Sequence, residues 1–238
     1  MTDWRNLIFS PLDLPDPPEI NMDKFIQWHS DQKKFMLQHN QNKVNSTNIY
    51  GGYCWHISWA IWWNTYELDN PWICDFDKRF PELVEYIGLF PFKKIKSISF
   101  LNQIGGAKVE PHSDPDSMWG MRFYLKNKTK DALYFSRMKE PNNHRIATME
   151  DESGNTVSTR KDHLEFCKDE KIYAKFPKDE CAWMLNSHRA WHGLDQNHSP
   201  TGSRITCAII GEYDKDKLFE LFKHSTDKHT NYQIWWDQ

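Results

Sequence analysis

Eight short segments rich in β-branched and aromatic residues run through the middle of the chain, separated by turns that contain Gly, Pro, Asn or Asp. Short segments joined by such turns are typical of strands in an antiparallel sandwich or barrel. We therefore expect a mainly β fold, and eight such strands fit a closed sandwich. The strands are predicted at about 95–103, 108–114, 119–126, 132–138, 171–176, 181–186, 188–194 and 203–212.

The chain before this core predicts flanking elements of several kinds. Four prolines in the first twenty residues indicate an extended arm on the surface. Apolar residues at helical spacing predict an amphipathic helix from Asn21 to about His39, so that the arm and helix occupy 1–45. A β-favouring run at 53–63 predicts a strand beside the barrel, and a short helix is expected at 81–89.

Two further segments stand apart from the strand pattern. The polar stretch 139–170 is too long for a simple turn, so we interpret it as either a lid or a disordered excursion. At 214–238, three apolar residues at helical spacing predict a helix, and an aromatic tail follows that we interpret as packing. We expect one domain, 1–238, because 238 residues is an ordinary length for a one-domain β-barrel-like protein.

Composition excludes several classes of protein. With 39% hydrophobic and 15% aromatic residues, the chain has enough apolar material for a packed core and is not disordered. A formal charge of −3 argues against a nucleic-acid partner bound mainly through its phosphates. Five cysteines without a CxxC spacing predict reduced structural thiols, and the absence of a signal-like or membrane-spanning segment predicts a soluble, cytoplasmic protein without a membrane partner.

One group of polar residues has the spacing of a metal site. His112 and Asp114 are two residues apart, so in an extended strand both project to the same side and can chelate one ion. His192 follows about eighty residues later. Two imidazoles and one carboxylate are the ligand set that holds a non-haem Fe(II) and leaves its other positions free.

A second group suits a carboxylate ligand. Twelve residues after His192, the strand that begins at Arg204 alternates two faces, with Arg204 and Thr206 on one and Ile205, Cys207 and Ile209 on the other. A guanidinium beside a hydroxyl forms a fork for a carboxylate. Because the neighbours are apolar, Arg204 is expected to be buried, and a buried arginine needs an anion.

Taken together, His112-x-Asp114, His192 and Arg204-x-Thr206 resemble the Fe(II)/2-oxoglutarate-dependent dioxygenases, whose core is a double-stranded β-helix of the jelly-roll or cupin-like type. The resemblance covers roughly residues 93–213. The segments 119–125 and 192–195 are similar to the aspartyl/asparaginyl β-hydroxylase-like branch, which includes free-amino-acid hydroxylases such as proline hydroxylases.

The resemblance implies roles for these residues. His112, Asp114 and His192 would bind Fe(II), and Arg204 and Thr206 would hold the distal carboxylate of 2-oxoglutarate. Arg122 is spaced like a second clamp, for a carboxylate of the cosubstrate or of an amino-acid substrate. With O2, the implied reaction hydroxylates a C–H bond of a free amino acid or peptidyl residue while 2-oxoglutarate loses CO2 to become succinate.

Two of these residues have alternative assignments. His188 lies four residues before His192 and would share its face of a strand, although the spacing to Arg204 favours His192 as the distal ligand. The alternative role for Arg122 is a salt bridge at a strand end.

A non-catalytic metal-binding cupin-like module is one rival function. An AlkB-like nucleic-acid demethylase is another, but that group has a second arginine where this chain has Ile210. The oligomeric state is left open.

Overall fold

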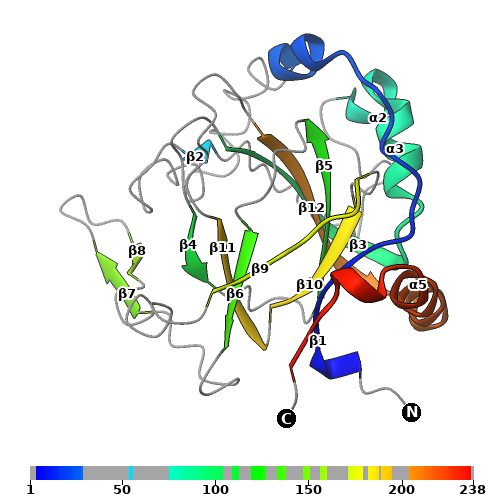
Figure 1. Cartoon of the computed structure of the whole chain (residues 1–238). Coiled ribbons are helices and arrows are strands. Elements are labelled where there is room, and N and C mark those ends of the chain that lie inside the picture. The colour runs from blue at the N-terminus through cyan, green and yellow to red at the C-terminus, as the bar shows by residue number, and fades with distance from the viewer. Residues whose placement is uncertain are drawn as a thin grey trace.

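The fold is built mainly from antiparallel strands. The structure, a computed structural model, describes residues 4–28, 54–55, 75–103, 109–112, 119–126, 133–137, 147–150, 156–159, 171–178, 182–187, 189–194 and 204–236. These residues form a seven-stranded sheet, here the large sheet, a four-stranded sheet, here the small sheet, and a separate two-stranded hairpin. In Figure 1 the labelled helices lie along the side of the large sheet away from the small sheet. The expected mainly β fold with flanking helices is confirmed.

The large sheet has the order β13-β1-β10-β5-β12-β3-β2 and the small sheet the order β4-β11-β6-β9. In the large sheet the strands are β13 (Ile234–Trp235), β1 (Leu7–Pro11), β10 (Ala182–Asn186), β5 (Trp119–Lys126), β12 (Arg204–Tyr213), β3 (Phe92–Gln103) and β2 (Cys54–Trp55). In the small sheet they are β4 (Val109–His112), β11 (Ala190–Leu194), β6 (Leu133–Arg137) and β9 (Ile172–Tyr173). All eight predicted core strands are therefore present, most of them within three residues of the expected ends.

The core strands pass back and forth between the two sheets. Along the chain, β3 lies in the large sheet, β4 in the small, β5 in the large and β6 in the small. The second half repeats this with β9 in the small sheet, β10 in the large, β11 in the small and β12 in the large. Each half of the core thus contributes two strands to each sheet.

Helices cover the outer face of the large sheet. They are the helical residues 22–28, α2 (Phe76–Arg79), α3 (Pro81–Ile87) and α5 (Lys215–Lys228), with short 3-10 turns at η1 (Trp4–Asn6) and η3 (Thr230–Tyr232). Pro81 begins α3, where its missing N–H costs nothing. The side chain of Asp214 accepts a hydrogen bond from the Lys217 N–H and so caps the start of α5.

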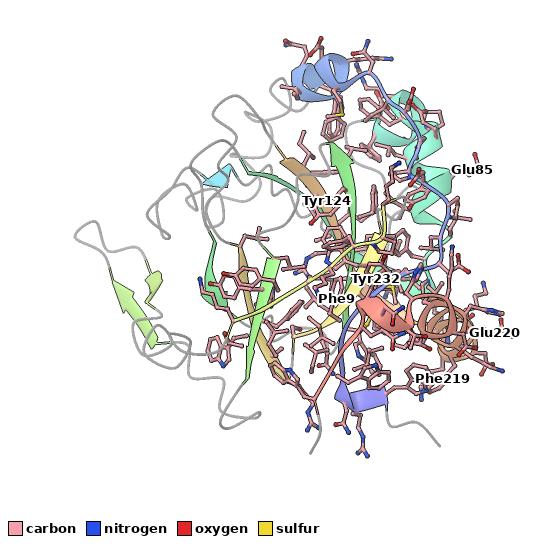
Figure 2. The ribbon with its side chains drawn as sticks, in the orientation of Figure 1. Phe9, Glu85, Tyr124, Phe219, Glu220 and Tyr232 are labelled. Atoms are coloured by element: carbon pink, nitrogen blue, oxygen red, sulfur yellow. The ribbon has the colours of Figure 1, made fainter. Side chains whose placement is uncertain are left out.

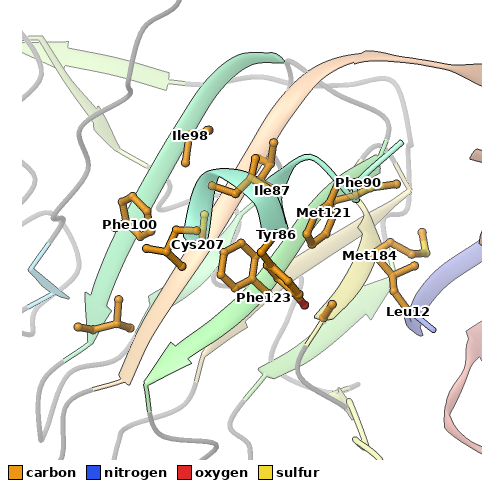
Figure 3. Close-up of a cluster of buried hydrophobic side chains, with 14 of the residues drawn as sticks. Leu12, Tyr86, Ile87, Phe90, Ile98, Phe100, Met121, Phe123, Met184 and Cys207 are labelled. Atoms are coloured by element: carbon orange, nitrogen blue, oxygen red, sulfur yellow. The ribbon is translucent and has the colours of Figure 1, made fainter. Parts of the chain in front are cut away.

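Two clusters of buried side chains form on the two faces of the large sheet. Between helices and sheet, Phe123, Cys207 and Tyr86 belong to one cluster, shown in Figure 3. Between the two sheets, Phe9, Tyr124, Phe135 and Trp183 belong to the other. Figure 2 shows Phe9 and Tyr124 in the region between the two sheets.

The N-terminal prediction is wrong in one respect. Residues 7–11 do not lie on the surface as an extended arm but form strand β1, which is buried along its whole length. β1 pairs with β10 through Phe9 opposite Leu185, and β13 pairs with β1 on its other side. Only the proline-rich residues that follow Pro11 run without regular structure to the helix at 22–28.

The other flanking predictions have mixed outcomes. The helix expected at 81–89 and the C-terminal helix are confirmed as α3 and α5, and the aromatic tail packs as expected, with Trp236 buried. Of the polar stretch 139–170, the described residues form a hairpin of β7 (Ala147–Glu150) and β8 (Thr156–Thr159), so part of it has regular structure. The rest of that stretch, and most of the expected strand at 53–63 and of the helix after Trp28, lie outside the described residues.

Gly211 occupies a place in β12 where no side chain fits. The register between β12 and β3 shifts next to it, and a Cβ at Gly211 would meet the Lys94 carbonyl oxygen and, at 2.9 Å, the Cα of Ile95. Because both contacts are with backbone, we expect Gly211→Ala to lower the free energy of unfolding by about 3 kcal/mol, the cost of an overpacked core. Urea denaturation measures this value.

Gly88 provides the control for that measurement. It ends α3 with a helical φ of −64°, which alanine adopts readily, and its side chain would be exposed. Gly88→Ala should change the unfolding free energy by less than about 1 kcal/mol. Equal effects of the two substitutions would contradict the close approach of β12 to β3.

Candidate functional site

The two faces of β12 are as the sequence predicts. Ile205, Cys207 and Ile209 belong to the cluster under the helices. Thr206 and Ala208 therefore lie on the opposite face, toward the small sheet. Thr206 is only 8% exposed, although it lies on the face away from the described helices. The Thr206 side of β12 therefore faces the interior between the two sheets.

His192 also lies on an interior face. Ala190 and Leu194, two residues before and after it on β11, both pack in the cluster between the sheets. A strand alternates its side chains, so His192 shares that face, and it is 4% exposed. A histidine buried between two sheets is in a position to bind a ligand or ion enclosed there.

The strand register places His112 next to His192. β4 and β11 are antiparallel, and the two histidines are directly opposite each other. Directly opposite residues share a face of the sheet, with Cβ atoms about 5 Å apart. The structure therefore brings together two residue positions that are eighty apart in the sequence. A spacing of about 5 Å between Cβ atoms suits two imidazoles that bind one metal ion.

A bulge in β4 accompanies this pairing. Between the His192–His112 and Leu194–Val109 pairs, β11 advances by two residues and β4 by three. The extra residue falls at Glu110-Pro111, and Pro111 has no N–H to lose from the ladder. In the described part of the small sheet β4 is an edge strand, where proline is tolerated. The bulge thus lies next to the backbone pairing of His112 with His192.

The remaining metal-ligand candidates lie outside the described residues. These are Asp114, two residues beyond the end of β4, and His188. Within the described part of the chain no group of three or more His, Cys, Asp and Glu side chains could hold a metal. The complete ligand set of His112, Asp114 and His192 therefore stays a prediction, of which the structure describes the pairing of two members.

The two arginines of the prediction occupy different parts of the large sheet. Arg204 is the first residue of β12 and pairs with Gln103, the last residue of β3. Arg122 on β5 pairs with Ala208, four residues further along β12, a separation of about 13 Å along the strand. The structure does not bring their backbone positions together, so a shared role on one carboxylate is not favoured.

The guanidinium of Arg122 turns away from the Arg204 end. It packs over Gly120, where a Cβ would lie 3.0 Å from the Arg122 Nη1 atom. Gly120 is near the start of β5 and opposite Leu185, whereas Ile205, next to Arg204, pairs with Lys126 at the end of β5. The absence of a side chain at Gly120 gives the guanidinium its room.

Sequence reasoning missed two polar-tipped aromatic residues on the interior face. Tyr124 is opposite Thr206, and Trp183 is opposite Arg122. The rings of Tyr124 and Trp183 are 4.2 Å apart between centroids and tilted by 37°. The available signal was the alternation along β10. Ala182 and Met184 pack under the helices, so Trp183 and Leu185 face the interior between the sheets.

Cys207 is not part of the site. It is a free cysteine on the helix-covered face of β12, and its burial raises the pKa of the thiol well above the ordinary value. The thiol therefore stays protonated, a poor nucleophile and a poor metal ligand. This agrees with the expectation of a reduced structural cysteine.

Comparisons with known proteins find distant structural likeness. No family model matches the sequence, and no curated protein matches it. A Pseudomonas putida prolyl-4-hydroxylase aligns over 79% of this chain and 81% of its own, at 9% identity and a TM-score of 0.29. A prolyl hydroxylase from Trichoplax adhaerens, solved with a hypoxia inducible factor peptide fragment, aligns over 90% and 86%, at 10% identity and 0.38.

A third structure, the nickel complex of the non-heme monooxygenase ThoJ, aligns over 96% of this chain and 97% of its own, at 11% identity and a TM-score of 0.35. These TM-scores are too low for the likeness to indicate a function. Among the described residues no helix is long and apolar enough to cross a membrane.

Proposed function

We propose that this protein is an Fe(II)- and 2-oxoglutarate-dependent dioxygenase that hydroxylates a C–H bond of an amino acid or peptidyl residue. The observation that carries the proposal is the direct pairing of His112 with His192 across β4 and β11. Chance placement of a predicted ligand pair would rarely give opposite positions on one interior face.

The fold supports this proposal through its strand order. Strands β3, β12, β5 and β10 lie side by side in the large sheet, and β4, β11, β6 and β9 form the small sheet. Successive core strands alternate between the sheets, which is the winding of a double-stranded β-helix, a jelly roll of eight strands. We assign the core to that fold.

Fe(II) would be held by His112, Asp114 and His192. Two imidazoles and a carboxylate suit a non-haem iron and leave adjacent positions free, and the register pair supplies the two imidazole positions of that set. Asp114, two residues after His112, belongs to the same strand pattern. A carboxylate at that position favours hydroxylation over halogenation, in which related enzymes leave the position to halide.

Arg204 and Thr206 would hold the distal carboxylate of 2-oxoglutarate. Thr206 is buried on the interior face, and Arg204 is two residues away on the same strand. When bound, iron and 2-oxoglutarate use O2 to hydroxylate the substrate, and 2-oxoglutarate is converted to succinate and CO2. The protein's own contribution is to orient the reactants and to exclude water with the aromatic cluster between the sheets.

Arg122 favours a substrate that bears a carboxylate. Its guanidinium lies over Gly120, away from the Arg204 end of β12, so we assign it to the substrate and not to the cosubstrate. Free amino acids and peptides with acidic groups fit this assignment. Ile210 lies at the position where nucleic-acid demethylases of the AlkB type have a second arginine, and the net charge of −3 also disfavours a nucleic-acid substrate.

The proposal is tested by the formation of succinate. The purified protein is incubated with Fe(II), ascorbate, O2 and 2-oxoglutarate, alone and with each of a panel of amino acids and short acidic peptides, and succinate is followed by proton NMR. We expect succinate above the level of a matched incubation with EDTA, and an increase with a carboxylate-bearing substrate. Metal-loaded protein that forms no succinate under any condition would instead favour a non-catalytic metal-binding module.

A further inference from the structure

Trp183 presents a buried hydrogen-bond donor between the two sheets. The residue is 3% exposed and belongs to the cluster between the sheets. Its indole Nε1 atom is inaccessible to solvent and has no hydrogen-bond partner in the part of the chain that the structure describes. A buried N–H without an acceptor is costly, and phenylalanine at this position would avoid the cost.

The indole ring is fixed in place by other aromatic rings. Tyr124 lies 4.2 Å away between ring centroids, and Phe176 contacts the indole at 5.4 Å in an edge arrangement with an interplanar angle of 83°. Two ring contacts on a buried side chain leave the N–H little freedom to turn toward another partner. The donor is therefore preorganised, as ligand-binding groups in rigid sites are.

The neighbours of Trp183 indicate the charge of the acceptor. Across β10 and β5, Trp183 is directly opposite Arg122, and its ring packs on Tyr124, which is directly opposite Thr206. Through Tyr124 the indole ring is therefore one strand away from Thr206, which is two residues from Arg204 along β12. The Arg122 guanidinium turns the other way, over Gly120. The Thr206 hydroxyl, and the Arg204 guanidinium that we propose beside it, favour an anionic oxygen as the group that accepts this hydrogen bond.

We propose that the Trp183 indole N–H donates a hydrogen bond to a carboxylate oxygen of bound 2-oxoglutarate. This inference rests on the proposed function and adds a residue to the cosubstrate site that sequence spacing does not reveal. Trp183 is a binding residue in this account. It fixes the 2-oxo acid on the face of the large sheet, together with Thr206 and Arg204.

The test is the affinity for 2-oxoglutarate, measured by isothermal titration calorimetry. Protein loaded with Mn(II), a redox-inert substitute for Fe(II), is titrated with 2-oxoglutarate for the wild type and for Trp183→Phe. Loss of one charge-assisted hydrogen bond should weaken binding by about tenfold to a hundredfold. The matched control is Trp28→Phe, a tryptophan of similar burial on the helix-covered side of the sheet, which should bind 2-oxoglutarate as the wild type does.

Three results would be informative. Weaker binding by Trp183→Phe alone supports the inference. Wild-type affinity in Trp183→Phe would overturn it, while the proposed function stands. No binding of 2-oxoglutarate by the metal-loaded wild type would overturn the proposed function itself.

A second variant covers the case in which Trp183→Phe does not fold. Replacement of Trp183 by 3-benzothienylalanine keeps the bicyclic shape and the contacts with Tyr124 and Phe176 but has sulfur in place of the N–H. The same weakening is expected with this residue, and an unchanged affinity would overturn the inference independently of side-chain volume.

Discussion

His192→Ala should lower the affinity of the protein for Fe(II) by at least about a hundredfold. Loss of a residue that only supports a metal ligand already lowers metal affinity by about 10- to 100-fold, and this substitution removes one of the three ligands themselves. His112→Ala should have the same effect, since the two residues are directly opposite each other on β11 and β4. Anaerobic equilibrium dialysis with Fe(II), followed by metal analysis, measures the change.

Two other histidines serve as controls for this prediction. His229, at the end of α5, is buried to a similar degree as His192 but lies outside the proposed site, so His229→Ala should leave the affinity for Fe(II) unchanged. His188→Ala tests the alternative distal ligand. If His188→Ala releases the metal while His192→Ala retains it, the assignment of the distal ligand is wrong.

Arg204→Ala should raise the concentration of 2-oxoglutarate needed for half-maximal succinate formation by about a hundredfold. The physical reason is that a carboxylate enclosed in the protein loses its cationic partner, which costs about 2–5 kcal/mol. Arg204→Lys keeps the charge but loses the planar fork of donors, so its effect should lie between those of the wild type and Arg204→Ala. The dependence of the succinate rate on 2-oxoglutarate concentration gives these values.

The control for Arg204 is an arginine far from the interior. Arg79 is exposed on α2, and Arg79→Ala should leave the requirement for 2-oxoglutarate unchanged. An unaltered requirement in Arg204→Ala would mean that the distal carboxylate binds elsewhere, with Arg122 the first alternative to examine.

The strands of the core could be predicted from the sequence because their signals are local. β5 was expected at 119–126 and is found at Trp119–Lys126, and β12 was expected at 203–212 and is found at Arg204–Tyr213. In both strands one face is apolar and packs under helices, which produces the alternation that the sequence displays. Turn residues on each side then fixed the ends.

Strand β1 could not be predicted because both of its faces are buried. Leu7 packs under the helices while Ile8 and Phe9 pack between the sheets, so the segment has no polar alternation. A proline also ends the strand at Pro11. Its place in the sheet depends on pairing with β10, more than 170 residues away in the chain. Such pairing is decided by tertiary packing and leaves no local pattern.

The candidate site shows the same division. The spacing of His112 and Asp114 is a local signal, but the position of His192 opposite His112 depends on the register between two distant strands and on the bulge at Pro111. Likewise, the burial of the Trp183 N–H follows from contacts with Tyr124 and Phe176, which come from other parts of the chain. Candidate ligands could thus be predicted from local spacing, whereas the strand register decides which of these positions lie opposite each other.

The most direct test of the central claim is the visible spectrum of the anaerobic protein with Fe(II) and 2-oxoglutarate. Chelation of iron by the 2-oxo acid gives a metal-to-ligand charge-transfer band and needs no knowledge of the substrate. We predict that the band forms in the wild type, is lost in His112→Ala and requires far more 2-oxoglutarate in Arg204→Ala. A folded, iron-loaded wild-type protein that shows no band would contradict the dioxygenase assignment.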